Sequence, residues 1–188
     1  MLRLLQLFKG KIDYLLRGMY FYVWDTSISN CENQPHNYLF LQIENFEELD
    51  KLEAKDVDKN LFKSRFEQGH FYCCLTTSTN VIVSSGWINY ATNHLVGELD
   101  LKLNLPHKIE FLYDFRTNES HRGLGLYPIL LKQISKRNDK IKLIYSLSAN
   151  GSSRRGIQKA KFKFLTTCFG FNAYKMNKII ANYVKNNN

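Results

Sequence analysis

The amino-acid sequence predicts an α/β domain built around a mixed β-sheet. Two short apolar runs rich in Val, Ile and aromatic residues lie in the first half and are joined by a turn, as in a β-hairpin. The second half alternates strand, helix, strand, helix and strand, which is typical of an α/β domain. Hydrophobic residues make up 44% of 188 residues, which is enough for one core and at most a small appendage.

The elements of the first half follow from apolar runs and from the residues that bound them. The helix that starts at residue 45 has acidic residues in its first turn, where they favour the helix dipole. We expect a strand over residues 37–43, helices over 45–54 and 57–68, strands over 70–77 and 80–92 that form the hairpin, and a strand over 97–105.

Residues 107–117 (HKIEFLYDFRT) predict the strand that tells most about function. Alternation places two sets of side chains on opposite faces: Ile109, Phe111, Tyr113 and Phe115 on one, and Glu110, Leu112, Asp114 and Arg116 on the other. The first set predicts a core face. The second set carries three charges, so it must face either a polar cleft or solvent, because an unpaired buried charge is costly.

Residues 119–131 (ESHRGLGLYPILL) combine two glycines with the start of an apolar helix, in which Pro128 falls in the first turn. Free N–H groups at a helix N-terminus, approached through glycine, can bind a diphosphate. A P-loop is excluded because Leu126 follows Gly125 where lysine is required, and a dinucleotide fingerprint is excluded by Pro128. A plain strand-to-helix turn is the alternative.

The rest of the chain predicts a strand over 141–148, a helix capped by Asn150 with Ser152 or Ser153, and two closing segments over 162–171 and 173–184.

The glycine turn resembles the acyl-CoA-binding motif Arg/Gln-x-x-Gly-x-Gly/Ala of the GNAT superfamily, the acetyl-CoA-dependent N-acetyltransferases. Arg122 to Gly125 fit this motif in order, whereas Tyr127 stands where Gly or Ala is usual. Downstream, four residues match the family's Asn-x-x-Ser and Lys-x-Gly-Phe patterns: Asn150, Ser153, Lys159 and Phe162. Lys161 replaces the glycine. The order of elements agrees from about residue 39 to 171.

The resemblance implies a mostly antiparallel, twisted sheet flanked by helices, whose fourth and fifth strands separate so that pantetheine pairs between them. It implies acetyl-CoA (coenzyme A) as co-substrate, no metal, and a coenzyme site formed by Phe115, Arg116, Thr117, Arg122, Gly123, Leu124, Gly125, Leu126, Tyr127, Asn150 and Ser153. Lys132, Arg154 and Arg155 could contact phosphates. An ordinary solvated basic face is the alternative for each.

The implied reaction is attack of a primary amine on the thioester, which requires removal of a proton from the amine. Glu110 and Asp114 are the first candidates for the base, and His94 and Glu98 come next. Many family members use a Tyr seven residues after the Asn as general acid, and here that position is Ile157. Ser153, Tyr145 or water would then protonate the thiolate, or it would leave unassisted.

The expected acceptor is a small-molecule amine, with an amino sugar or sugar nucleotide first and a protein or peptide amine second. Other readings are an inactive GNAT-like binding protein and, less favoured, a nucleic-acid-binding module. The net charge of 26 − 17 = +9 would suit several anionic partners. The nucleic-acid reading is weak because its basic residues overlap the expected coenzyme site. A monomer or a homodimer is expected.

Residues 1–38 are predicted to be an amphipathic or extended appendage to an acetyltransferase domain over 39–188. Charges from Arg3 to Arg17 exclude a membrane-spanning helix over residues 1–24, and the cleavage site of a signal peptide is missing. A helix here, with Met19 on its apolar face, could touch a membrane surface, a partner or its own domain. Scattered Cys and His residues predict neither zinc nor disulfides, so we expect a cytoplasmic protein, with the inner membrane surface as alternative.

Overall fold

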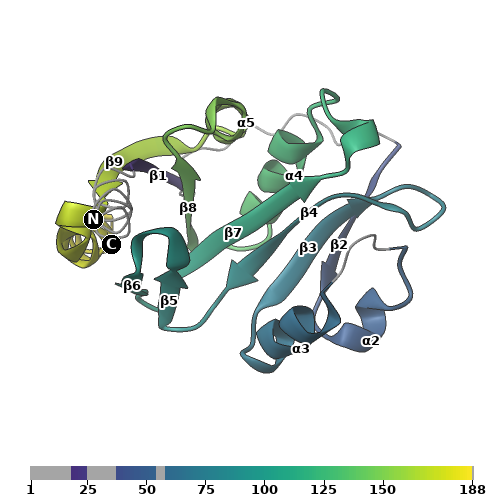
Figure 1. The fold of residues 1–188 in the computed structure, drawn as a ribbon, viewed down its shortest axis with the longest axis horizontal. Helices are drawn as coiled ribbons and strands as arrows, with labels where there is room; N and C mark the ends of the chain where they lie inside the picture. Colours follow the sequence, from purple (N-terminus) through teal and green to yellow (C-terminus); the bar gives the residue numbers. More distant parts are fainter. Residues whose placement is uncertain (1–17, 25–36, 54–57, 188) are drawn as a thin grey trace, which may run out of the picture.

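The computed structural model describes residues 18–24, 37–53 and 58–187. Within these ranges one seven-stranded sheet has the order β2-β3-β4-β7-β8-β1-β9, and β5 and β6 form a separate ribbon (Figure 1). The strands are β1 (Gly18–Trp24), β2 (Leu39–Ile43), β3 (Phe71–Thr76), β4 (Ile82–Asn89), β5 (Asn93–Val96), β6 (Leu101–Asn104), β7 (Ile109–Thr117), β8 (Ile141–Leu147) and β9 (Lys163–Phe169). Only the pair β7–β8 of the described sheet is parallel, which confirms the predicted fold class.

The helices lie between and after these strands. The α-helices are α2 (Phe46–Leu49), α3 (Lys59–Glu67), α4 (Leu126–Ser135), α5 (Gly151–Lys159) and α6 (Met176–Asn186), and the 3₁₀ turns are η1 (Gly97–Leu99), η2 (Glu119–His121) and η3 (Gly170–Lys175). The order β7, α4, β8, α5, β9 matches the prediction. The first expected helix is one turn long, and the strand expected over residues 97–105 is η1 followed by the shorter β6, because Asp100 turns left-handed at φ 44°. The ribbon strand β5 was not predicted.

Strand β1 lies inside the sheet, antiparallel to β8 on one side and β9 on the other. Met19, Phe21 and Val23 are buried on one face, and Tyr22 is buried on the other. The prediction of a helix that includes Met19 is therefore wrong for residues 18–24. These residues form a strand, because an apolar and aromatic run that is buried on both faces fits the interior of a sheet. Residues 1–17 lie outside the described residues. Part of the predicted appendage is thus a strand of the sheet.

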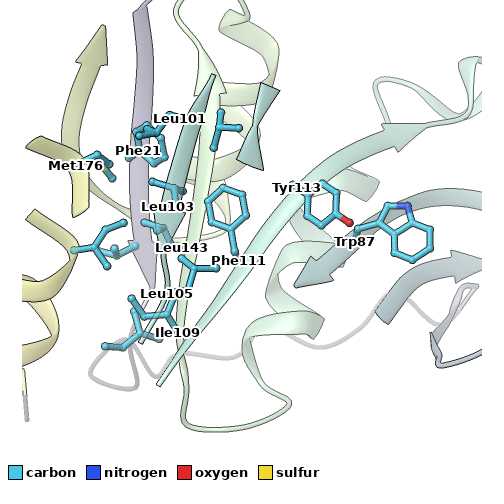
Figure 2. Close-up of a cluster of buried hydrophobic side chains, with 14 of the residues drawn as sticks. Phe21, Trp87, Leu101, Leu103, Leu105, Ile109, Phe111, Tyr113, Leu143 and Met176 are labelled. Atoms are coloured by element: carbon cyan, nitrogen blue, oxygen red, sulfur yellow. The ribbon is translucent and has the colours of Figure 1, made fainter. Parts of the chain in front are cut away.

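Each face of the sheet has its own core. One core contains Phe21, Trp87, Phe111 and Tyr113 and is covered by α2, α3, the β5–β6 ribbon and α6 (Figure 2). We call this face the ribbon face. The other core contains Leu112 and is covered by α4 and α5, and we call it the helix face.

A bulge in β7 changes which side chains point to which face. Tyr113 pairs with Trp87 and Arg116 pairs with Ser85, so Asp114 and Phe115 together oppose the single residue Gly86. Asp114 adopts φ 51°, a left-handed conformation. Such an extra residue reverses the alternation beyond it. The prediction that Phe115 shares a face with Phe111 is therefore wrong, since Phe115 packs on the helix face.

Candidate active site

The parallel strands β7 and β8 separate towards their carboxyl ends. They pair from Ile109–Ile141 to Leu112–Ile144, and no further pair joins these two described strands although both continue (Figure 1). Helices α4 and α5 follow the two open ends. We call this opening the fork. Its backbone edges are available to a ligand, because a strand edge carries N–H and C=O groups that need partners.

The N-terminus of α4 lies beside the fork and is approached through two glycines. Gly123 has φ 83° and Gly125, the N-cap, has φ 74°, and no side chain of the described residues caps the helix. A Cβ at either glycine would meet no described atom within 4 Å, so the turn is open. The first N–H groups of a helix have no partner within it. This arrangement fits an anionic group such as a diphosphate.

Helix α5, which follows β8, packs against α4. Asn150 is the N-cap: its side-chain oxygen accepts hydrogen bonds from the Ser153 N–H at 3.0 Å and from the Ser152 hydroxyl at 2.9 Å. The Asn-x-x-Ser spacing is therefore a helix cap, as predicted. The Ser153 side chain is free of this cap and is hydrogen-bonded to the Tyr127 phenol.

Two aromatic rings connect β7, α4 and α5 on the helix face. The Phe115 and Tyr127 rings lie 5.5 Å apart, centroid to centroid. Each ring lies where a glycine leaves space, because a Cβ at Gly86 would overlap the Phe115 ring and a Cβ at Gly156 would overlap the Tyr127 ring. Burial raises the pKa of Tyr127, so its hydroxyl is protonated at neutral pH.

The remaining expected coenzyme residues lie along the loop from β7 to α4. The exposed Arg122 side chain pairs with Glu119 at 3.0 Å, and the Thr117 hydroxyl lies 3.1 Å from that of Ser84. Leu124 is exposed, whereas Leu126 is buried in the core. The structure therefore brings Phe115, Tyr127 and Ser153 into one contact group beside the turn.

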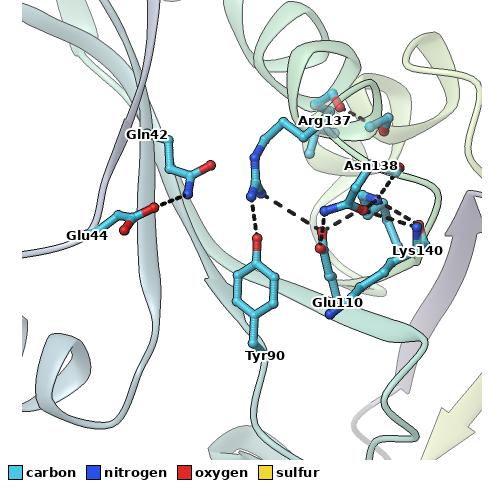
Figure 3. A network of polar contacts seen from close by, with 10 residues as sticks. Gln42, Glu44, Tyr90, Glu110, Arg137, Asn138 and Lys140 are labelled. Carbon is cyan, nitrogen blue, oxygen red and sulfur yellow. Dashed lines mark hydrogen bonds and ion pairs between the residues drawn. The ribbon is translucent and has the colours of Figure 1, made fainter.

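Glu110 does not face the fork. It lies at the paired end of β7 and is fully buried next to Asn138 (Figure 3). It forms a 3.4 Å ion pair with Lys142, which is also fully buried. Its other oxygen accepts a 2.6 Å hydrogen bond from Asn138. Burial lowers the pKa of Lys142, an effect that Glu110 opposes. These contacts give Glu110 a structural role, and none of them connects it to the fork.

Asp114 lies on the ribbon face, opposite Glu110. Its carboxylate accepts a 2.7 Å hydrogen bond from Arg65 of α3, whose guanidinium lies 5.0 Å from the ring centroids of Trp87 and Tyr113. Arg116 approaches the other oxygen at 3.4 Å. The prediction that the two carboxylates share a face is wrong, because the bulge at Asp114 turns its side chain over. Asp114 is therefore paired with two arginines, one from α3 and one from its own strand.

A different carboxylate stands near the fork. Tyr113 and Tyr145 are the first residues of β7 and β8 beyond the last strand pair. The Tyr145 hydroxyl donates to both Glu98 carboxylate oxygens, at 3.0 and 3.1 Å. Burial and the neighbouring Glu98 raise the pKa of Tyr145. Glu98 and Tyr145 thus form a pair that could take up and deliver protons on the ribbon face of the fork.

His94 is held as a neutral ring beside this pair. The Asn89 amide is oriented at both ends, since its oxygen accepts from the Ala91 N–H at 2.6 Å and its nitrogen donates to the Asn93 carbonyl at 2.9 Å. The same nitrogen donates to Nδ1 of His94 at 2.9 Å. Nδ1 is therefore the acceptor and the proton of the neutral ring is on Nε2.

The surroundings of His94 also disfavour a second proton. Burial, then the neighbours His70 and Arg65, lower the pKa of His94 to about 4. His70, whose Nδ1 lies 2.5 Å from the Tyr113 hydroxyl, has its pKa lowered to about 4 by burial and Arg65. Neither ring is charged at neutral pH.

The comparisons with known proteins agree on the fold. No family model matches the sequence, and no curated protein matches it. Solved structures do match: a GNAT-family acetyltransferase from Colwellia psychrerythraea has a TM-score of 0.54 and 12% identity, covering 87% of this chain and 59% of that one. A GCN5-related N-acetyltransferase from Sphaerobacter thermophilus has a TM-score of 0.51 and 10% identity, covering 89% and 54%. The fold is the GNAT fold.

A GCN5-related N-acetyltransferase-like protein from Streptococcus suis has a TM-score of 0.51 and 10% identity, with 86% of this chain and 64% of that chain covered. The chain therefore spans a little more than half the length of its GNAT-fold neighbours. Among the residues that the structure describes, no helix is long and apolar enough to cross a membrane, and no three His, Cys, Asp or Glu side chains are grouped to hold a metal ion.

The sequence reasoning missed Arg65, Tyr113 and the pairing of Glu98 with Tyr145 as features of the site. The alternation of apolar and polar residues along β7 predicts that Tyr113 is a core residue and gives no sign that it lies at the site. Arg65 lies on α3 and Glu98 follows the ribbon strand β5, both far from β7 in the chain. No local pattern predicts such contacts.

Proposed function

We propose that this protein is an N-acetyltransferase that transfers an acetyl group from acetyl-CoA to a primary amine. The observation that carries the proposal is the fork between β7 and β8 beside the glycine-flanked N-terminus of α4. The helix terminus would bind the diphosphate, and the open strand edges would pair with the amides of the pantetheine arm. The residues of this end are Arg122 to Tyr127, with Phe115 to Thr117, Asn150 and Ser153 alongside.

The chemistry needs a proton acceptor for the amine and a donor for the thiolate. We assign these roles to Glu98 and Tyr145 in place of Glu110, Asp114 and Ser153. The amine nitrogen attacks the thioester carbon, the carbon–sulfur bond breaks, and the amine proton passes to Glu98. Tyr145 protonates the thiolate and recovers a proton from Glu98, to which its hydroxyl is bonded. The cycle then closes without any other group.

The acceptor would approach from the ribbon face, where Glu98 lies. A small-molecule amine is the first proposal, with amino sugars and sugar nucleotides ahead of peptide amines. The net charge of +9 supports an anionic acceptor of either kind. The Tyr127 ring, which is packed between α5 and β7, favours a second candidate, an inactive GNAT-like protein that does not bind coenzyme.

Thermal unfolding with and without acetyl-CoA tests the proposal. Coenzyme at about a hundred times its dissociation constant should stabilise the protein by about 2.7 kcal/mol. Gly125→Val should abolish most of this shift, because its φ of 74° strains a β-branched residue and the new side chain would stand at the turn. Leu124→Ala is the matched control, because it shortens an exposed side chain of the same loop and keeps the backbone N–H groups that would bind the diphosphate.

No stabilisation by acetyl-CoA or CoA, together with stabilisation by single-stranded DNA, would replace this proposal with the nucleic-acid reading. Equal shifts in the Gly125→Val and Leu124→Ala variants would mean that the turn is only structural.

A further inference from the structure

The interface between α4 and α5 lies between the two parts of the proposed coenzyme site. The diphosphate would lie at the N-terminus of α4, and the thioester would lie in the fork between β7 and β8. The chain that joins them must pass the facing first turns of α4 and α5. Tyr127 lies in the first turn of α4, and Ser153 lies in the first turn of α5.

The Tyr127 side chain crosses this route. Its hydroxyl is hydrogen-bonded to Ser153, and its ring lies against Gly156 one turn further along α5. The ring also contacts Phe115, which belongs to the β7 wall of the fork. One residue of α4 therefore touches both α5 and β7, at the level where an arm between the helices would have to lie.

The fit between Tyr127 and Gly156 shows that the ring belongs in this position. Gly156 is buried, and any larger residue there would overlap the ring. A buried glycine inside a helix lowers helix stability by roughly 1 kcal/mol relative to alanine, so its presence needs a packing reason. Accommodation of the Tyr127 ring supplies that reason.

We infer that Tyr127 is a gate: its ring fills the space between α4, α5 and β7 in the free protein and must leave Gly156 and Ser153 before the arm of the coenzyme can reach the fork. This inference rests on the proposed function, because it concerns the same coenzyme site.

A closed gate lowers apparent affinity. When only a fraction of the molecules is open, the apparent dissociation constant equals the intrinsic one divided by that fraction. Minor states of this kind are commonly populated at about 10% or less. Removing the ring should therefore tighten coenzyme binding by about tenfold or more, and the gain should appear in the association rate constant.

Stopped-flow and calorimetric titrations with CoA test this on the full chain. Tyr127→Ala should bind CoA about tenfold more tightly than the wild type, with faster association. Tyr127→Phe keeps the ring and loses the bond to Ser153, so it should change in the same direction by less. Ile129→Ala is the control, because it shortens a partly buried side chain of the same helix outside the contact group.

Unchanged or weaker CoA binding by Tyr127→Ala, with normal binding by the wild type, would overturn the gate and leave the proposed function intact. In that case the ring would be a wall of the site. Absence of CoA binding by the wild type, Tyr127→Phe and Tyr127→Ala alike would overturn both the gate and the proposed function, because binding would then be missing with and without the ring. Circular dichroism of each variant shows that it is folded.

Discussion

Glu98 and Glu110 show how surroundings decide what a carboxylate can do. Glu110 is fully buried against Lys142 and Asn138, so its carboxylate serves as the counter-charge of the buried Lys142 ammonium. Glu98 is partly exposed, and its described hydrogen bonds come from Tyr145, which lies at the fork. Removal of one partner of a buried ion pair destabilises the protein, because the other charge is left buried without a partner. A partly exposed carboxylate can be replaced with little effect on the free energy of unfolding.

These differences predict opposite outcomes for two identical substitutions. Glu110→Gln should lower the free energy of unfolding by about 3 kcal/mol, because it leaves the Lys142 ammonium without its counter-charge. Glu98→Gln should lower it by less than about 1 kcal/mol and should reduce turnover at least about a hundredfold. Urea denaturation measures the first quantity, and acetyl transfer to a panel of amino sugars, polyamines and peptides measures the second.

The result that counts against this assignment is full activity of Glu98→Gln on an amine that the wild type acetylates. A stable but inactive Glu110→Gln variant would return the role of base to Glu110.

At the residue level the glycine turn and the cap of α5 were more predictable than the orientation of the carboxylates on β7. Gly123, Gly125, Asn150 and Ser153 belong to short motifs whose spacing itself produces the turn and the cap. The orientation of Asp114 depends on a bulge, and strict alternation cannot show where an extra residue enters a strand.

At the level of elements, the end of α5 shows a local conflict between residue and conformation. Lys161 follows the helix with φ 70°, and its N–H donates to the Gln158 carbonyl at 2.9 Å. The Phe162 N–H donates to the Ile157 carbonyl at 3.3 Å. This is a left-handed helix terminus of the kind that usually has glycine. The lysine that departs from the family pattern therefore keeps the backbone conformation of the expected glycine.

Lys161→Gly should consequently stabilise the protein. A left-handed non-glycine residue is strained by roughly 1–2 kcal/mol, and glycine regains part of this while its unfolded state is more flexible. We expect a net gain of about 0.5–1 kcal/mol in the free energy of unfolding, measured by urea denaturation. Arg155→Gly is the control, since Arg155 is an exposed residue inside the helix and its replacement should destabilise by about 1 kcal/mol. A loss of stability in Lys161→Gly would mean that the lysine side chain makes a contact worth more than the strain.

Most elements were predictable because their signals are local. Hairpin strands, the helix start after Gly125 and the cap at Asn150 depend on neighbours in the chain. The ribbon strand β5 is four residues long and packs through contacts from elsewhere, so its own sequence does not specify it.

At the scale of the whole molecule, β1 joins the two ends of the chain. It pairs with β8 and β9, whose residues lie more than a hundred positions away in the sequence. The apolar pattern of residues 18–24 fits a strand or a short buried helix, and only the neighbouring strands decide between them. Without β1, the edge of β8 that faces β1 and the edge of β9 that faces β1 would both lose their hydrogen-bonded partner among the described residues. The predicted boundary at residue 38 would then separate a domain from one of its own central strands.

A pair of phenylalanine substitutions tests whether β1 belongs to the cooperative fold. Phe21 of β1 is fully buried and its ring centroid lies 5.9 Å from that of Tyr145, whereas Phe164 of β9 is 57% exposed. Phe21→Ala should lower the free energy of unfolding by about 3–5 kcal/mol, the usual range for a buried Phe, and Phe164→Ala by less than about 1 kcal/mol. Both values come from urea denaturation followed by far-ultraviolet circular dichroism. If residues 1–38 were an appendage to an independently folded domain, Phe21→Ala would leave the main urea-unfolding transition unchanged. That result would restore the predicted domain boundary at residue 38.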